Sequence, residues 1–358
     1  MKKLRAAVVG LRMGQAHVGG FASNPELFDL VALCDLNSEL ANDVAKKRNV
    51  PRVYADYDEM LAKEKLDAVA IATPTQLHCG MTVKAARAGA RGIYCEKPIA
   101  LSMGEMREMR TACEASRCAL VVGHQRRMST PYISMKKLMD SGAIGDVYLI
   151  RVFAPGDCLS DGTHSIDSVS YLLGNAKPES IVSHANYACK DDLDGTGIGK
   201  RFGHLVESGT MSIITYSRTL RFELFSGDTR VHNWDQPFPG WAYQDVEVFG
   251  TKGRLWRCGD SPEPPIKIWD DQPGGWRAAP LCDDVGDTFK HVFREFADTI
   301  HTGKPHPMGI ETAALTHEIL MGIYESARLN KVVTLPVQQD RYPLELVFEQ
   351  RKKQKENS

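Results

Sequence analysis

The stretch VVGLRMGQAH, residues 8–17, determines how the first third of the chain is interpreted. Its apolar start predicts a buried strand that ends at Gly10, and Gly14 stands where a helix would begin. Glycine allows a tight turn and a close approach of the backbone to a phosphate, and the free amides of a helix N-terminus attract anions. The stretch therefore predicts a strand–turn–helix unit that binds a dinucleotide pyrophosphate, although Arg12 stands where a glycine is expected.

An acidic residue follows the second apolar run. LFDLVALCD ends at Asp35, 21 residues after Gly14, which is the usual place for the acid that accepts the hydroxyl groups of the adenosine ribose. Residues 36–45 contain no Arg or Lys that could bind a 2′-phosphate, so the sequence favours NAD over NADP. A strand–turn–helix unit that binds no cofactor is the alternative at this point.

Apolar runs and helix-like segments alternate over the first third, which is typical of a parallel sheet covered on both faces. From about residue 178 to 270, longer runs such as SGTMSIITYSR alternate apolar and polar residues, which predicts antiparallel strands. The predicted fold class is α/β, with an N-terminal Rossmann domain and a C-terminal α+β domain that has a large open, mostly antiparallel sheet. We place an NAD-binding domain at 1–123, a domain for substrate binding and oligomerisation at 124–340, and a solvated or frayed tail at 341–358.

Composition excludes several classes of protein. The chain has 358 residues, 43% of them hydrophobic, and a formal net charge of −1, so no overall attraction to nucleic acid or to an anionic membrane is expected. No apolar stretch is long enough to span a bilayer. The nine cysteines include no CxxC pair, which argues against a disulfide framework and favours the cytoplasm.

His301 and His306 lie in a Gly/Pro turn without acidic neighbours, so we expect no metal site.

A second candidate site is CEKP, residues 95–98. It follows an apolar run and should lie at the carboxyl edge of the parallel sheet, where ligands bind. A lysine held there by a following proline could exchange a proton with a substrate beside a nicotinamide. A surface ion pair between Glu96 and Lys97 is the alternative.

A third candidate is SDGTHSID, residues 160–167. In a helix, Ser160, His164 and Asp167 would share one face, and histidine is suited to proton exchange near neutral pH. Asp161 could instead cap the helix, and a single helical histidine is more often a hydrogen-bonded core residue than a catalyst. Farther along, the aromatic residues of WDQPFPGWAY, 234–243, could line a sugar site or pack a loop.

Taken together, these motifs resemble the glucose–fructose oxidoreductase, inositol dehydrogenase and MocA-like (Gfo/Idh/MocA) family of NAD(P)-dependent oxidoreductases. The resemblance runs from about residue 4 to 335 and rests on GLRMGQAH, ATPTQLH with CEKP, GHQRRM, SGAIGDV, DGTHSIDSVSYLLG, FGTKGRL and GIYESARLN. It implies a nicotinamide cofactor and hydride transfer at a sugar, polyol or related carbon. The open sheet, often buried between subunits in this family, favours a homodimer or homotetramer.

The resemblance also assigns roles to individual residues. Lys97 matches the family's catalytic lysine, and the Lys97-Pro98 bond is then a candidate cis peptide. His164 matches the second proton-handling residue. Many members carry an Asp four residues before that histidine, whereas this chain has Ser160 there and Asp161 one place later. Either Asp161 substitutes as a catalytic residue or the acid is dispensable.

Two sets of contacts follow from these positions. The predicted cofactor contacts are Gly10, Arg12, Met13, Gly14, Asp35, Thr73, Pro74, His78, Glu96, Lys97 and Gln125. The predicted substrate contacts are Lys97, Arg126, Ser160, His164 and His204. The last of these belongs to RFGHLVES, residues 201–208, which is similar to a stretch of some sugar-acting members.

We therefore predict an NAD-dependent dehydrogenase of a sugar, sugar derivative or cyclitol, in which Lys97 and His164 handle the hydroxyl proton. The alternative is an NAD-dependent glycoside-cleaving enzyme that oxidises a sugar hydroxyl, eliminates the aglycone, adds water and reduces the carbonyl again. A non-catalytic sensor of cofactor or sugar is less favoured, because both proton-handling residues are present. Specificity for the small carbohydrate substrate is expected in loops at residues 155–161 and 228–243.

Overall fold

The computed structural model describes residues 2–229, 244–259, 264–270, 272, 274–282 and 284–357. The chain forms two compact units, each built from two segments: Met1–Met128 with Val285–Ala314, and Ser129–Asp284 with Leu315–Ser358. Most of the predicted specificity loop 228–243, including the aromatic segment 234–243, lies outside the described residues. The two units are described separately below.

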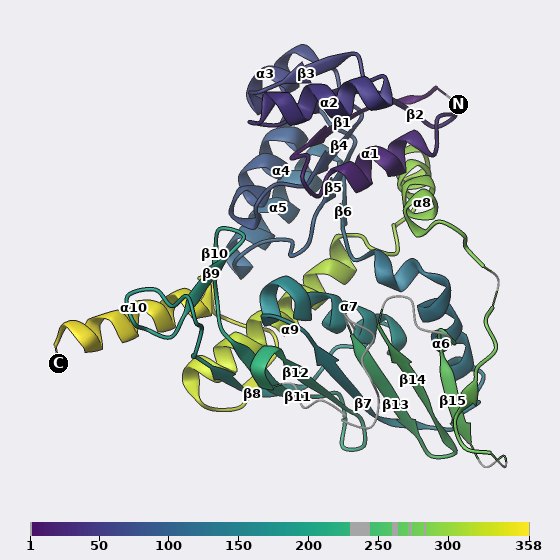
Figure 1. The fold of residues 1–358 in the computed structure, drawn as a ribbon, viewed down its shortest axis with the longest axis vertical. Helices are drawn as coiled ribbons and strands as arrows, with labels where there is room; N and C mark the ends of the chain where they lie inside the picture. Colours follow the sequence, from purple (N-terminus) through teal and green to yellow (C-terminus); the bar gives the residue numbers. More distant parts are fainter. Residues whose placement is uncertain are drawn as a thin grey trace. The chain divides into compact units, whose positions relative to one another are not determined.

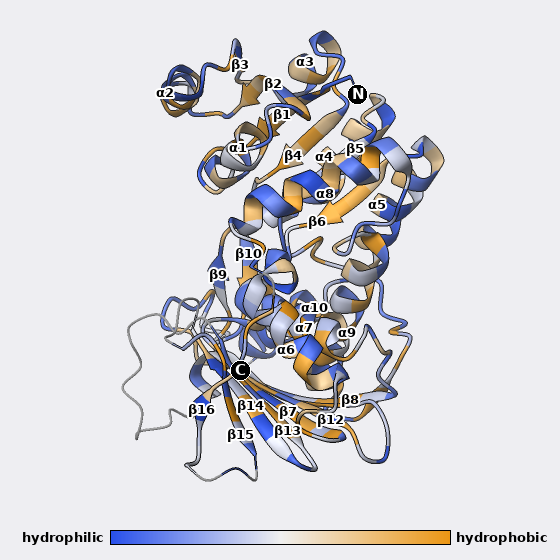
Figure 2. Ribbon diagram, turned by 90° about the vertical axis from the view of Figure 1, so that its right-hand side faces the viewer, coloured by the Kyte–Doolittle hydropathy of each residue, from blue (hydrophilic) through white to orange (hydrophobic). Residues whose placement is uncertain are grey.

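Six described strands form a parallel sheet in the first unit, in the order β3-β2-β1-β4-β5-β6 (Figure 1). They are β1 (Leu4–Val9), β2 (Phe28–Cys34), β3 (Arg52–Tyr54), β4 (Ala68–Ile71), β5 (Gly92–Cys95) and β6 (Ala119–Val122). Every residue of β4 and β5 is buried, and Figure 2 shows both strands as hydrophobic segments. Burial on both faces explains the continuous apolar runs, and the predicted parallel α/β domain is confirmed.

Helices connect these strands: α1 (Gln15–Ala22), α2 (Ser38–Arg48), α3 (Tyr57–Lys63), α4 (His78–Arg87) and α5 (Met103–Ser116), with short turns of 3₁₀ helix at Thr75–Leu77 and Gln125–Met128. Polar caps fix three of their starts. Asn37 accepts from the amide of Leu40, and Asp56 accepts from that of Glu59. Ser102 accepts in the same way from Glu105. Each cap binds an amide that the first turn of a helix cannot pair internally.

A later segment of the chain completes the first unit. Helix α8 (Thr288–Thr302) was expected in the second domain, but it groups with residues 1–128 instead. Its Phe293 ring lies 4.6 Å from that of Phe21 and 5.0 Å from that of Tyr94, and a Cβ on Gly20 would lie 2.4 Å from Phe293. The apolar face of α8 thus buries itself on α1 and β5, a long-range contact that local sequence patterns do not reveal.

Nine described strands form the main sheet of the second unit, in the order β16-β15-β14-β13-β7-β12-β11-β8-β17. They are β7 (Val147–Ala154), β8 (Ser180–Asn186), β11 (Gly209–Thr215), β12 (Arg221–Ser226), β13 (Asp245–Gly250), β14 (Gly253–Cys258), β15 (Lys267–Asp270), β16 (Arg277–Ala278) and β17 (Val333–Thr334). The pairs are antiparallel except for β7 with β12. The predicted large, mostly antiparallel sheet is therefore confirmed.

Helices α6 (Thr130–Asp140), α7 (Thr163–Leu172) and α9 (Ile310–Leu329) lie on one face of this sheet (Figures 1 and 2). Buried and less buried residues alternate along β8 and β11. Val182, Met211 and Ile213 are exposed on the opposite face, at 42%, 48% and 39%. The alternation predicted from sequence thus reflects a sheet with one face packed and one face open.

The charged end of the chain also differs from expectation. Residues 343–356, expected to be solvated or frayed, form helix α10 (Pro343–Glu356). Arg351 lies over the ring of Tyr187, 4.5 Å from its centroid, and donates to the carbonyl of Thr196 at 2.7 Å. Lys352 pairs with Asp194 at 2.9 Å. Its first turns bury three apolar residues, Pro343, Leu344 and Val347, and the cationic contacts hold its later, apolar-poor part, whose packing local sequence patterns do not reveal.

Among the described helices, none is both long and apolar enough to cross a membrane. All nine cysteines are free thiols, and six of them are buried.

We predict that Phe293→Ala destabilises the first unit by about 3 to 5 kcal/mol, the usual cost of removing a buried aromatic ring. Hydrogen exchange of amides in β1 and β2 should accelerate, while exchange in β7 and β12 stays unchanged. Arg294→Ala is the matched control, because its exposed ion pair with Glu26 contributes about 1 kcal/mol or less. Faster exchange in β7 and β12 alone would contradict the grouping of α8 with the first unit.

Candidate functional site

The carboxyl ends of five neighbouring strands are in register in the first unit. Val9 pairs with Cys34 and Ile71, and Cys95 pairs with Ile71 and Val122. The residues that follow these ends therefore share one edge of the sheet. They include the predicted cofactor residues Gly10, Asp35, Thr73, Pro74, Glu96, Lys97 and Gln125. The structure thus brings these positions together from five separate parts of the sequence.

The first turn leaves no room for side chains at either glycine. Gly10 has a φ of +81°, and a Cβ there would lie 2.5 Å from the carbonyl oxygen of Ala72. A Cβ on Gly14 would lie 2.0 Å from the carbonyl oxygen of Gly10. Arg12 and Met13, between them, are exposed. The turn therefore keeps its tight glycine geometry, and the Arg12 side chain does not occupy the turn.

Asp35 fixes this turn through backbone amides. One carboxylate oxygen accepts from the amide of Leu11 at 2.6 Å, and the other accepts from that of Asn37 at 2.8 Å. A carboxylate can accept about four hydrogen bonds, so Asp35 retains capacity for ribose hydroxyl groups. The same residue can therefore shape the turn and bind the adenosine end of a dinucleotide.

Glu96 connects the first helix with the turn that carries Lys97. Its Oε1 lies 2.9 Å from Nε2 of His17, and its Oε2 accepts from the amide of Lys97 at 3.0 Å. Burial raises the pKa of Glu96, but the His17 contact and the Lys97 charge outweigh it and hold the pKa at about 2. Glu96 is therefore ionised at neutral pH. The Lys97-Pro98 peptide is cis, as expected.

His78 joins two loops of the same edge. Its Nδ1 lies 2.9 Å from the carbonyl oxygen of Pro98, and its Nε2 lies 2.9 Å from that of Thr73. Burial lowers the pKa of His78, and the backbone carbonyl groups oppose this shift. Both ring nitrogens thus contact backbone of the chain itself, which gives His78 a role in connecting the loops.

A dinucleotide fits the residues on this edge. The glycine turn excludes side chains, and Gly14 gives helix α1 no side-chain cap, so amides of its first turn remain available for a phosphate. Gln125 has a buried Oε1 without a hydrogen-bond partner in the described part of the chain. Arg126 follows on the same 3₁₀ turn and is partly buried. These donors and acceptors suit a ligand that carries phosphates, hydroxyl groups and an amide.

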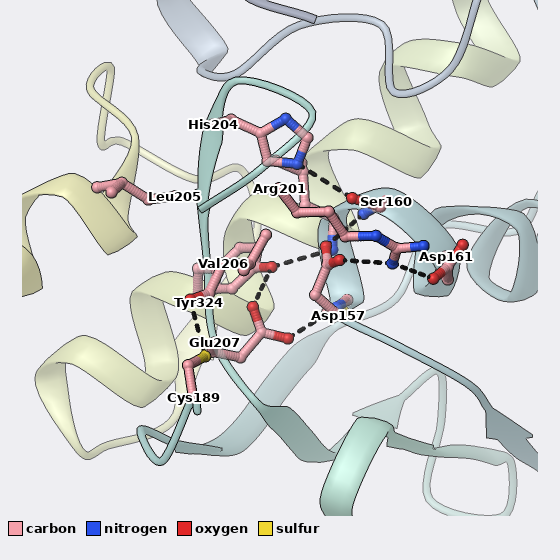
Figure 3. A network of polar contacts seen from close by, with 12 residues as sticks. Asp157, Ser160, Asp161, Cys189, Arg201, His204, Leu205, Val206, Glu207 and Tyr324 are labelled. Atoms are coloured by element: carbon pink, nitrogen blue, oxygen red, sulfur yellow. Dashed lines mark hydrogen bonds and ion pairs between the residues drawn. The ribbon is translucent and has the colours of Figure 1, made fainter. Parts of the chain in front are cut away.

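In the second unit, the predicted residues Ser160 and Asp161 lie in a turn of π-helix, Cys158–Gly162, directly before α7. Such turns are rare and occur frequently at functional sites. Side chains accept hydrogen bonds from three consecutive backbone amides at its start (Figure 3). Glu207 accepts from the amide of Cys158 at 2.7 Å, and the Tyr324 hydroxyl accepts from that of Leu159 at 3.0 Å. Asp157 accepts from the amide of Ser160 at 2.7 Å. This segment is therefore fixed before α7 begins.

A tight hairpin reaches the same segment. Strands β9 (Gly199–Arg201) and β10 (His204–Val206) pair Arg201 directly with His204. The two residues between them, Phe202 and Gly203, have φ angles of 50° and 90°, as a two-residue hairpin turn of type I′ requires. The turn thus places the side chains of Arg201 and His204 next to each other.

Both of these side chains bind the π-helical segment (Figure 3). Arg201 contacts the carboxylates of Asp157 at 3.0 Å and Asp161 at 2.5 Å, and Nε2 of His204 lies 3.0 Å from Oγ of Ser160. A Cβ on Gly156 would lie 2.1 Å from the Asp161 carboxylate, so this position must be a glycine. The structure therefore brings Ser160, Asp161 and His204 together.

His164 and Asp167 lie on the buried helix α7. His164 is 4% exposed, and Asp167 accepts from the hydroxyl of Thr316 at 3.3 Å. The proton-handling role predicted for His164 stays a prediction.

Sequence reasoning missed several residues of both sites. His17 belongs to the opening stretch VVGLRMGQAH, while Arg201 and Glu207 belong to RFGHLVES, of which only His204 was selected. These three residues could have been selected from the sequence, because each is a charged or titratable side chain close to an apolar run. Tyr324 gave none, since its role depends on a contact with a residue 117 positions away.

Glu207 is a buried acid that forms no ion pair with any residue that the structure describes. It accepts from the Tyr324 hydroxyl at 2.7 Å and from the amide of Cys158. Burial, reinforced by the negative charge of Asp157, raises its pKa to about 7 against these hydrogen bonds. Arg201 contacts Asp157 and Asp161 instead. The carboxyl group of Glu207 therefore titrates near neutral pH.

Comparisons with known proteins place these sites in context. Residues 4–124 match the Gfo/Idh/MocA model, described as an oxidoreductase family with an NAD-binding Rossmann fold. A myo-inositol 2-dehydrogenase of Thermotoga maritima is 24% identical over 84% of this chain and 90% of its own length. A 2,7-anhydro-N-acetylneuraminate hydratase of Mediterraneibacter gnavus is 28% identical over 71% of this chain and 67% of its own length.

A solved structure extends the comparison of the fold. The WlbA dehydrogenase of Bordetella pertussis, in complex with NADH and UDP-GlcNAcA, covers 94% of this chain and 100% of its own, with a TM-score of 0.75 and 20% identity. The two-unit architecture is thus shared over nearly the whole chain. The matched family model identifies residues 4–124 as an NAD-binding Rossmann domain.

We predict that Glu207 makes stability fall as the pH rises. The folded-state pKa of about 7 exceeds the ordinary value of 4.5, so this contribution is complete below about pH 4.5 and is lost by about pH 7. The loss amounts to at most about 3 kcal/mol, because one pKa unit corresponds to about 1.4 kcal/mol. Thermal unfolding between pH 4.5 and 8 should show this decline in the wild type and not in Glu207→Gln.

Glu179→Gln is the control, because Glu179 is exposed and its replacement should leave the wild-type profile unchanged. Parallel profiles for the wild type and Glu207→Gln would refute the titration of Glu207 in this range.

Proposed function

Because the chain belongs to the Gfo/Idh/MocA family of NAD-binding oxidoreductases, we propose that it is a dehydrogenase of a sugar, sugar derivative or cyclitol. The observation that carries this proposal is the shared sheet edge, on which the glycine turn, Asp35 and the Glu96-bound backbone of Lys97 follow strands in register. The relative named as a myo-inositol 2-dehydrogenase supports a polyol as substrate.

In this proposal, NAD accepts the hydride from the carbon that bears the reacting hydroxyl group. The family resemblance supports Lys97 as the group that takes the hydroxyl proton and returns it in the reverse reaction, with His164 as the second proton-handling residue. Glu96 holds the Lys97 backbone and, being ionised, places a negative charge beside the lysine. Gln125 and Arg126 contact the cofactor and the substrate, respectively.

A reaction without net oxidation is the second candidate. The relative named as a hydratase favours it, because hydration adds water and leaves no reduced cofactor. In such a reaction, Lys97 and His164 would move protons during transient oxidation, elimination, water addition and reduction. Net oxidation releases NADH in proportion to product, whereas this cycle needs NAD and accumulates no NADH.

We further propose that the chain forms a homodimer or homotetramer through the open face of its large sheet. Val182, Met211 and Ile213 are exposed there, and the rings of Phe153 and Phe225 stack 5.2 Å apart across β7 and β12. Neighbouring apolar side chains of this kind mark a surface suited to association. The free thiols of all nine cysteines support action in a reducing compartment such as the cytoplasm.

Ile213→Asp is predicted to shift the protein toward monomers in sedimentation velocity experiments, because a carboxylate would be buried without a partner. Ala176→Asp, at an exposed loop position, is the charge-matched control and should leave the sedimentation coefficient unchanged. A wild-type protein that sediments as a monomer at all concentrations would refute association through this face.

Lys97→Ala should lower turnover by about 100-fold to 10,000-fold, the usual contribution of a positioned acid–base group. The affinity of this variant for NADH should stay within about threefold of the wild-type affinity, because the loss of one contact changes the binding free energy little. The assay follows NADH and product with myo-inositol, scyllo-inositol, D-glucose and aryl glycosides. Lys84→Ala, which removes an exposed lysine paired with Asp58, should behave as the wild type.

Near-normal turnover of Lys97→Ala would remove the lysine from the mechanism. Product formation that needs NAD without accumulating NADH would favour the second candidate function. A wild-type protein that binds NADH but turns over none of these compounds would support a sensor instead.

A further inference from the structure

We propose that His17 is a positioning residue for Lys97 and acts on it through the carboxylate of Glu96. This role rests on the proposed function, in which the Lys97 amine exchanges the hydroxyl proton. Two contacts connect the three residues. Nε2 of His17 lies 2.9 Å from Oε1 of Glu96, and Oε2 of Glu96 accepts from the amide of Lys97 at 3.0 Å. The His17 side chain is completely buried, although it is polar.

The contact between His17 and Glu96 has a defined direction. Burial raises the pKa of Glu96, but the His17 contact and the Lys97 charge hold it at about 2, so Glu96 is ionised. An ionised carboxylate only accepts hydrogen bonds, so Nε2 of His17 carries a proton and donates to Oε1 of Glu96. A charge removed from water is stable only while such partners remain. His17 therefore maintains the negative charge beside Lys97.

Three other titratable groups interact electrostatically with Glu96: Tyr94, Cys95 and His78. Burial raises the pKa of Tyr94 and of Cys95 well above their ordinary values, so both stay neutral. Burial lowers the pKa of His78, and both nitrogens of its ring contact backbone carbonyl oxygens. These three groups therefore add no charge beside Glu96 at neutral pH.

Packing holds the His17 ring in place. Its centroid lies 4.8 Å from that of the Tyr94 ring, on β5, and 6.0 Å from those of Phe289 and Phe293. Both phenylalanines belong to α8, which joins the first unit from a distant part of the sequence. A side chain packed against rings from two elements keeps one orientation, which a group that positions a catalytic residue requires.

Glu96 transmits this fixed orientation to Lys97. Its two oxygens bind different elements, α1 through His17 and the turn after β5 through the Lys97 amide. A Cβ on Gly123, directly after β6, would lie 3.1 Å from Oε2 of Glu96, so backbone also lies against the carboxylate. The anchored amide fixes the start of the Lys97 side chain, and the negative charge favours its protonated form. His17 thereby sets the position of Lys97 and the pH range in which its amine can accept a proton.

The first test replaces His17 and measures turnover of whichever of myo-inositol, scyllo-inositol or D-glucose the wild type oxidises fastest. His17→Leu removes the donor and should lower kcat by about 10-fold to 100-fold, the usual effect of a misplaced catalytic group, while KM changes by less than about threefold. His17→Gln, whose amide can still donate to Glu96, should recover most of the loss. Glu96→Gln combined with His17→Leu should lose no more than Glu96→Gln alone, because both residues act through one contact.

The second test observes the Lys97 amine directly, without substrate or cofactor. Acetic anhydride labels the uncharged amine, and mass spectrometry of the Lys97 peptide from about pH 7 to 11 gives the midpoint of its titration. Loss of the His17 donor leaves burial to raise the pKa of Glu96, so the labelling midpoint in His17→Leu should move down by about one pH unit. His17→Gln should keep the wild-type midpoint.

Two further variants control these tests. His291→Leu replaces a half-buried histidine of α8 in the same unit and should match the wild type in both. His17→Asn, whose shorter amide cannot reach Glu96, should behave as His17→Leu and takes its place if the apolar variant does not fold. Wild-type kcat or an unchanged labelling midpoint in these two His17 variants would overturn the proposal. A wild type that is inactive on all three compounds would instead refute the proposed function, while the labelling would still decide whether His17 controls the Lys97 amine.

Discussion

Carboxylates that accept backbone amide hydrogens shape the glycine turn, the Lys97 turn and the π-helical segment at Ser160. Asp35 binds the amides of Leu11 and Asn37, and Glu96 binds that of Lys97. In the second unit, Asp157 binds the amide of Ser160, and Glu207 binds that of Cys158. Amides at the ends of strands and helices have no partner within their own element, and an ionised acceptor binds them more strongly than a neutral one. The geometry of both sites depends on these bonds.

Burying these carboxylates makes their charged form less favourable, and the two units differ in the neighbouring charges that offset this cost. Glu96 lies beside His17 and Lys97, and its pKa is held at about 2 despite burial. Glu207 accepts hydrogen bonds, but its charged neighbour is the negative Asp157. Burial and this like charge therefore raise the pKa of Glu207 to about 7. Burial penalises the charged form in both cases, and the neighbouring charge decides the direction of the shift. One acid therefore stays ionised at neutral pH, while the other titrates there.

The sequence predicts the first site better than the second because its residues follow strand ends. Parallel strands in register bring the residues after them to one edge, so Gly10, Asp35 and Lys97 could be grouped from apolar runs alone. The role of α8 could not be predicted in this way, since Phe293 meets Phe21 only after the chain returns from the second unit. The contact of His204 with Ser160 likewise depends on a hairpin whose position local patterns do not encode.

The identity of residue 160 follows from the charges around it. Asp157 and Asp161 share one guanidinium group, that of Arg201, and burial with the negative charge of Asp157 raises the pKa of Glu207 to about 7. A fourth acid at position 160 would lie among like charges in a buried segment, where each further carboxylate is harder to ionise. Serine avoids this cost, and its hydroxyl oxygen lies 3.0 Å from Nε2 of His204. The hairpin that brings Arg201 to Asp157 and Asp161 also brings His204 to Ser160, so a single two-residue turn fixes both contacts of the segment.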